Sequence, residues 1–184
     1  MIRRAFAIAL FCQSLGALAC QRVNDDAHDA HDAPAEDAEE SETRGQVQRY
    51  VFGTTDGQEL SAESMHGRVT VLLFVTTFDL ASQVAAKQLN QVFHTHRPRI
   101  NAGAIVVEAA KYAPLADVFR STLELSYPVA IADLDTLQRN STLGEVRSVP
   151  TLIVFDAAGR EELRKTGSFS PEELNGWITR GERP

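Results

Sequence analysis

Residues 69–83 read VTVLLFVTTFDLASQ, and this stretch decides the fold. Its first part, 69–76, is a nearly continuous apolar run rich in β-branched side chains, which is typical of a strand buried on both faces of a sheet. The segment 81–96 follows after a short turn and has apolar residues at helical spacing. These residues are Val84, Leu89, Val92 and Phe93. A buried strand that leads directly into a long helix predicts an α/β protein.

Strand-like and helix-like segments alternate along the rest of the chain. We expect strands at 50–53, 104–107, 127–132, 151–155 and 161–165, a helical turn at 61–65, and helices at 114–123, at 136–143 and from 171 on. The last helix has a clear start, with Ser170 as N-cap, Pro171 at the first position and Glu173 at the third. Strands separated by helices, then a hairpin and a terminal helix, predict a mixed central β-sheet flanked by helices.

The first residues have the layout of an export signal. Arg3 and Arg4 precede an apolar stretch and small residues, which predicts a signal peptide over 1–19 that is too short to span a bilayer permanently. The ending GALAC resembles the bacterial lipoprotein signal, which implies cleavage before Cys20, lipidation of its thiol and anchoring to a membrane face. Gln21 would then favour the periplasmic face of the outer membrane. The alternative is ordinary cleavage, which leaves Cys20 as a free terminal thiol.

The next segment, 20–46, is predicted to be an acidic disordered linker. Its part 24–42 lacks Val, Ile, Leu and aromatic residues, so it cannot bury enough apolar surface to offset the entropy of ordering. Repulsion between its carboxylates extends the chain, as suits a tether. His28 and His31 stand among these carboxylates, which leaves metal handling by the tether open beside the simpler interpretation of a solvated linker.

The cysteine and charge counts limit what the remaining residues, 47–184, can do. Cys12 and Cys20 are the only cysteines, so this predicted domain has no thiol, although an exported chain enters an oxidising compartment. Residues 45–184 carry 16 acidic and 14 basic residues, and this balance provides no excess of positive charge for nucleic acid. We therefore expect no nucleic-acid partner, no cofactor and no metal in the domain.

Three phrases of the sequence resemble one known family. DGQELSAESMHGRVTVLLF (56–74), FVTTFDLASQ (74–83) and RSVPTLIVFDAAGRE (147–161) are similar to segments of the thioredoxin-like superfamily. Together these phrases narrow the resemblance to the exported, membrane-tethered thiol–disulfide reductases of the TlpA type. The resemblance covers about 51–180, and the VPT segment is its most specific part. It implies a thioredoxin-like fold, thiol–disulfide oxidoreductase activity and a cis peptide bond before Pro150.

The same resemblance places the two catalytic cysteines of that family on Asp79 and Ser82. Disulfide exchange needs a thiolate at the helix start and a second thiol to release it, and neither a carboxylate nor a hydroxyl replaces them. An acid–base role for this pair would need a His or Lys that the sequence does not place nearby. We therefore predict degenerate active-site positions, no catalytic residue, and a helix N-cap at Asp79.

One part of that family's function needs no sulfur. In thioredoxin-like proteins the residue before the cis proline offers backbone groups to an extended peptide, so Val149 and Pro150 beside Phe78 and Leu80 would form a shallow peptide-binding groove. The sequence therefore favours a lipid-anchored, redox-inactive binding or assembly module of the bacterial cell envelope, with an envelope protein or an extended peptide as partner. The alternatives are a thiol–disulfide oxidoreductase, as the family suggests, and metal handling by the His/Asp tether.

Overall fold

The computed structural model describes residues 45–183. The predicted signal peptide, the lipidation site Cys20 and the histidines His28 and His31 lie outside the described residues. Within 45–183, no helix is long and apolar enough to cross a membrane.

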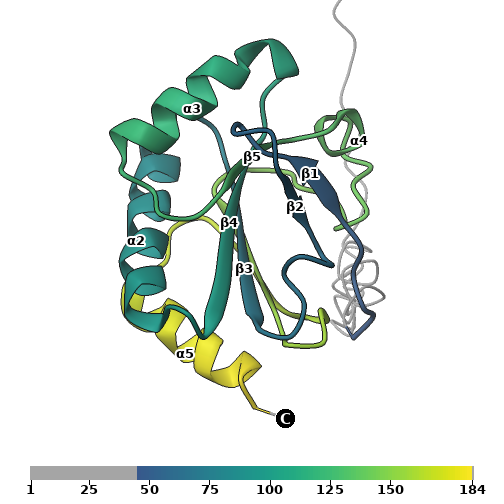
Figure 1. Ribbon diagram of the computed structural model, residues 1–184, viewed down its shortest axis with the longest axis vertical. Coiled ribbons are helices and arrows are strands. Elements are labelled where there is room, and N and C mark those ends of the chain that lie inside the picture. The colour runs from purple at the N-terminus through teal and green to yellow at the C-terminus, as the bar shows by residue number, and fades with distance from the viewer. Residues whose placement is uncertain (1–44, 184) are drawn as a thin grey trace, which may run out of the picture. The chain divides into compact units, whose positions relative to one another are not determined.

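A five-stranded mixed sheet lies at the centre of the described chain (Figure 1), in the order β5-β4-β3-β6-β7. Its strands are β3 (Val69–Val75), β4 (Ile100–Val106), β5 (Val129–Ile131), β6 (Thr151–Phe155) and β7 (Glu161–Thr166). The first three run parallel, β6 is antiparallel to β3, and β7 is antiparallel to β6. The ends of β3, β4 and β5 and the start of β6 therefore meet at one edge of the sheet, which we call the carboxyl edge.

Both faces of the sheet are covered, which explains the continuous apolar run of β3. One face carries α2 (Leu80–His96), α3 (Ala113–Thr122) and α5 (Pro171–Gly181) (Figure 1). The other face carries α4 (Leu134–Leu137) and the two-stranded sheet of β1 (Val51–Gly53) and β2 (Glu59–Ser61). Alternate β3 side chains enter the two resulting cores, and all seven residues of the strand are buried. The predicted mixed sheet flanked by helices is confirmed.

Several predicted elements differ from the structure in their bounds or type. Strand β4 begins at Ile100 instead of 104 and pairs with β3 from Val69 on. The Asn101 side chain donates to the Met65 carbonyl, and Gly103 has no side chain that would collide with Leu60 of β2. Strand β2 itself was not predicted, and the segment after it forms turns instead of a helical turn at 61–65.

The helix predicted at 136–143 is wrong in both bounds. It is the short helix α4, which ends at Leu137. Asp133 caps it by accepting from the backbone N–H of Thr136 at 2.8 Å. Arg139 then has a left-handed backbone, with φ of 63°, so the helix cannot continue and the chain enters an irregular segment, 138–150.

Candidate functional site at the carboxyl edge

The turn between β3 and α2 lies at the carboxyl edge and is organised by Asp79. Its carboxylate accepts from the backbone N–H groups of Ser82 at 2.8 Å and of Ala81 at 3.3 Å. It also accepts from the Ser82 hydroxyl at 2.9 Å. The hydrogen bonds from the Ser82 backbone and hydroxyl hold the pKa of the Asp79 carboxyl below its usual range. The geometry is that of the predicted N-cap.

Ser82 connects the two sides of this turn. Its side chain is fully buried, and its Oγ accepts from the backbone N–H of Thr76 at 3.2 Å while donating to Asp79. Both hydrogen-bonding roles of the hydroxyl are therefore used within the turn. A buried hydroxyl that already donates to a carboxylate is placed to hold the turn rather than to attack a substrate.

Glu108 is a site residue that sequence reasoning missed. It lies two residues after β4, is 8% exposed, and accepts from the Thr77 backbone N–H at 2.5 Å and from Thr77 Oγ1 at 2.8 Å. Gln83 of α2 holds the same turn residue from the other side by donating to the Thr77 carbonyl at 3.2 Å. The available signal was a lone carboxylate directly after a buried strand, because the ends of neighbouring parallel strands meet at one edge.

The two residues that flank Asp79 are large, apolar and exposed. Phe78 is 79% exposed and Leu80 is 73% exposed. Leu134 and Tyr112, which follow β5 and β4, are exposed as well and come from connections that begin at the same edge. Phe78 and Leu80 thus expose two large apolar side chains in one turn, which indicates an interaction surface more strongly than a single exposed residue would.

Pro150 lies at the carboxyl edge directly before β6, the strand that is antiparallel to β3. The Val149–Pro150 peptide bond is cis, and Thr151 directly after it pairs with Phe74 near the end of β3. The Pro150 carbonyl accepts from the Gly167 N–H at 2.8 Å. The backbone N–H and C=O of Val149, by contrast, have no hydrogen-bond partner within residues 45–183. The structure thus places Val149 and Pro150 at the same edge of the sheet as Phe78, Asp79 and Leu80.

Two other kinds of functional site are possible within residues 45–183, a pocket and a group of metal ligands. A pocket of about 390 Å³ lies between the segment 47–51, the turns after β2 and the β6–β7 turn, and none of the predicted site residues lines it. Residues 45–183 contain no group of three or more His, Cys, Asp and Glu side chains that could hold a metal ion. The tether histidines are outside the described residues.

Comparisons with known proteins identify the fold. No protein-family model matches the chain, and no curated protein matches it. Solved structures do match, and three of them cover about three quarters of this chain. A thioredoxin family thiol:disulfide interchange protein from Chlorobium tepidum is 21% identical, with 75% of this chain and 96% of that chain covered and a TM-score of 0.62. A DsbF homologue from Corynebacterium diphtheriae is 18% identical, with 74% and 87% covered and a TM-score of 0.65.

The chain has a thioredoxin-like fold. A third match, a secreted Mycobacterium tuberculosis disulfide oxidoreductase homologous to E. coli DsbE, is 19% identical over 71% of this chain and 95% of that chain, with a TM-score of 0.59. All three identities are low, so the likeness shows the fold alone. Within this fold, the turn of Asp79 and Ser82 follows β3 and the loop of Pro150 precedes β6, so both lie at the carboxyl edge.

Proposed function

We propose that residues 47–184 form a redox-inactive thioredoxin-like module, related to the TlpA type, that binds extended apolar peptide segments in the cell envelope. The hydrogen bond between Asp79 and Ser82 is the main support for this proposal. Asp79 and Ser82 hydrogen-bond to each other at 2.9 Å at the two positions where the resemblance expects cysteines. The chain has no cysteine after Cys20 that would replace them.

The chemistry of disulfide exchange explains why we favour binding over catalysis. Exchange forms a mixed disulfide between a protein thiolate and one substrate sulfur, and a second thiol must then resolve it. A carboxylate and a buried hydroxyl form no such intermediate. The oxidoreductase function that the family suggests is therefore the alternative that this site supports less well.

The binding surface is proposed at Val149, Phe78 and Leu80. The unpaired N–H and C=O of Val149 would exchange backbone hydrogen bonds with an extended segment, as a sheet edge does. Apolar side chains of that segment would cover Phe78 and Leu80, each worth about 1.5–3 kcal/mol when fully buried. After the cost of association is subtracted, these few contacts support only weak binding.

Weak affinity suits a module that is held near its partners. A lipid on Cys20 and the acidic linker 20–46 would keep the domain at the membrane face, where the effective concentration of envelope proteins is high. Labelling of exported protein with radioactive palmitate tests the anchor. We expect incorporation in the wild-type chain and none in Cys20→Ala, and an unlabelled wild-type chain would contradict the anchor.

A peptide titration tests the proposed groove. The probe is fluorescein-labelled, S-carboxymethylated insulin B chain, which is apolar, extended and free of thiols, titrated with the full chain and followed by anisotropy. Leu80→Ser should weaken binding at least fivefold, about the loss of one partly buried Leu contact. The matched control is Val47→Ser, because Val47 is 58% exposed but bridges to Arg160 in the β6–β7 turn, at the opposite end of β6 from Pro150. No binding by the wild-type chain, or equal loss in both variants, would contradict the proposal.

A further inference from the structure

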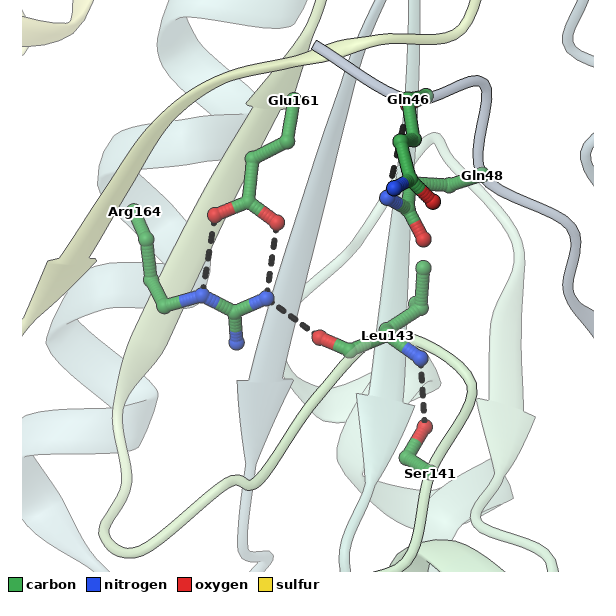
Figure 2. A network of polar contacts seen from close by, with 6 residues as sticks. All are labelled: Gln46, Gln48, Ser141, Leu143, Glu161 and Arg164. Carbon is green, nitrogen blue, oxygen red and sulfur yellow. Dashed lines mark hydrogen bonds and ion pairs between the residues drawn. The ribbon is translucent and has the colours of Figure 1, made fainter. Parts of the chain in front are cut away.

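A buried ion pair lies on the edge strand β7 (Figure 2). Glu161 and Arg164 form a two-pronged contact, in which Nε donates to one carboxylate oxygen at 3.0 Å and Nη2 to the other at 2.8 Å. Their side chains are 2% and 8% exposed. Charged side chains are rarely buried to this extent, so the pair calls for a physical reason.

A bulge in β7 makes this pair possible. Residues three apart in a regular strand point to opposite faces. Here Phe155 pairs with Glu161 and Val154 pairs with Leu163, so Glu162 is an extra residue in the ladder. The shift turns Glu161 to the face on which Arg164 lies, which is the face that carries the irregular segment 138–150.

Arg164 of the ion pair also contacts the irregular segment 138–150. Nη2 of Arg164 also donates to the carbonyl of Leu143 (Figure 2). Leu143 and Val146 insert buried side chains into the core below, and Val149 packs against it. The Thr142 hydroxyl also donates to the Arg49 carbonyl at 2.7 Å, so the Arg164 guanidinium is one of several contacts that hold the segment. The same segment ends in Val149 and Pro150, which makes it the support of the proposed groove.

Stability alone is a weak explanation for the pair. Removing two charges from water costs several kcal/mol per ion, and well-packed apolar residues of similar volume often serve stability equally well or better. Arg164 also has a buried Nη1 without a hydrogen-bond partner among the described residues, which is a further cost. Apolar residues could not donate a hydrogen bond to the Leu143 carbonyl. The guanidinium does donate to it and thereby fixes the direction of this carbonyl.

We infer that the Glu161–Arg164 pair is a positioning device for the segment that presents Val149 and Pro150. Its main contribution is to peptide affinity, because it fixes the shape of the segment, and its contribution to stability is small. The inference rests on the proposed peptide-binding function of that segment. Glu161 and Arg164 act through Leu143 and do not themselves contact the peptide.

The test replaces both charges in the full chain. Glu161→Leu/Arg164→Met keeps the volume and leaves no charge unpaired, so its Tm should equal or exceed that of the wild-type chain. Its affinity for S-carboxymethylated insulin B chain, expressed per folded molecule, should fall about tenfold, a typical size for the loss of a coupled support. Amide hydrogen exchange should accelerate in 141–149 and stay unchanged in β3. A lower Tm with unchanged affinity of the folded molecules would mean a purely structural pair and would overturn the inference.

A conservative variant keeps the test decisive if the double variant does not fold. Arg164→Lys retains a positive charge beside Glu161, but one ammonium cannot reproduce the fixed fork that reaches both the carboxylate and Leu143. We expect faster exchange in 141–149 and a partial loss of affinity. Unchanged exchange in this variant would overturn the positioning role. Failure of the wild-type chain to bind the peptide would instead overturn the proposed function.

Discussion

The carboxylate of Asp79 accepts a 2.9 Å hydrogen bond from the hydroxyl of Ser82 at the first turn of α2. The sequence resemblance predicts that these two positions correspond to the catalytic cysteines of thioredoxin-like reductases. On that prediction, a hydrogen bond would join the positions that a disulfide joins in such a reductase. Since the same carboxylate also caps the helix, the turn keeps its shape without sulfur.

Removal of the Asp79 side chain should destabilise the start of α2. Asp79→Ala leaves the Ser82 and Ala81 N–H groups without their acceptor, and we expect Tm to fall by roughly a few degrees. Asp79→Asn retains a side-chain oxygen and should lose less. Thermal unfolding followed by circular dichroism measures both. An unchanged Tm in Asp79→Ala would show that the cap is not needed.

The stabilising effect of Asp79 should depend on pH. Its hydrogen bonds with Ser82 lower the pKa in the folded chain, so the carboxylate contributes stability above the unfolded pKa of about 4 and loses that contribution as the pH falls through the lower folded pKa. The Tm difference between the wild-type chain and Asp79→Asn should therefore be constant from pH 5 to 7 and shrink below about pH 4. A difference that grows on acidification would contradict this sign.

Glu108 should contribute to the stability of the Phe78–Leu80 turn. Glu108→Ala removes the acceptor of two Thr77 hydrogen bonds in a buried place, and we expect a loss of about 2 kcal/mol in the free energy of unfolding. Glu108→Gln keeps one acceptor oxygen and should lose clearly less. Urea unfolding gives both values. Equal losses would mean that the cavity left by the side chain matters more than its hydrogen bonds.

Gly103 should resist enlargement, because a Cβ there would lie 2.2 Å from Cδ1 of Leu60, which is fully buried. Gly103→Ala must displace β2 or its side chain, and we expect a destabilisation of about 1–3 kcal/mol. Gly53→Ala is the matched control, since Gly53 also lies in a strand and has open space around it. Urea unfolding measures the free energy of unfolding of both variants. Equal losses in the two variants would contradict the close contact between Gly103 and Leu60 of β2.

The sequence was informative where structure is determined locally. The apolar run of β3 and the capping box of Ser170 and Glu173 are properties of neighbouring residues, and both elements were predicted close to their observed bounds. The cap at Asp79 is equally local, because it joins residues two and three apart.

Contacts between segments distant in sequence could not be predicted from local patterns. Thr77 and Glu108 are 31 residues apart, and they meet only because the ends of the parallel strands β3 and β4 lie at one edge of the sheet. Asn101 likewise donates to the Met65 carbonyl of a distant segment, and the β7 bulge depends on pairing with β6. In the sequence, Glu108, Asn101 and Glu162 resemble ordinary loop or surface residues. Their structural roles become visible only in the folded chain.

An insulin reduction assay shows whether this chain catalyses disulfide exchange. The sample is the full chain with Cys20→Ser, so that no thiol remains after the predicted signal peptide, and the same chain carrying Asp79→Cys and Ser82→Cys is the comparison. We predict that the Cys20→Ser chain reduces insulin no faster than dithiothreitol alone, whereas restored thiols at a helix N-terminus produce turnover above that background. Turnover by the Cys20→Ser chain itself would contradict the account of a redox-inactive binding module.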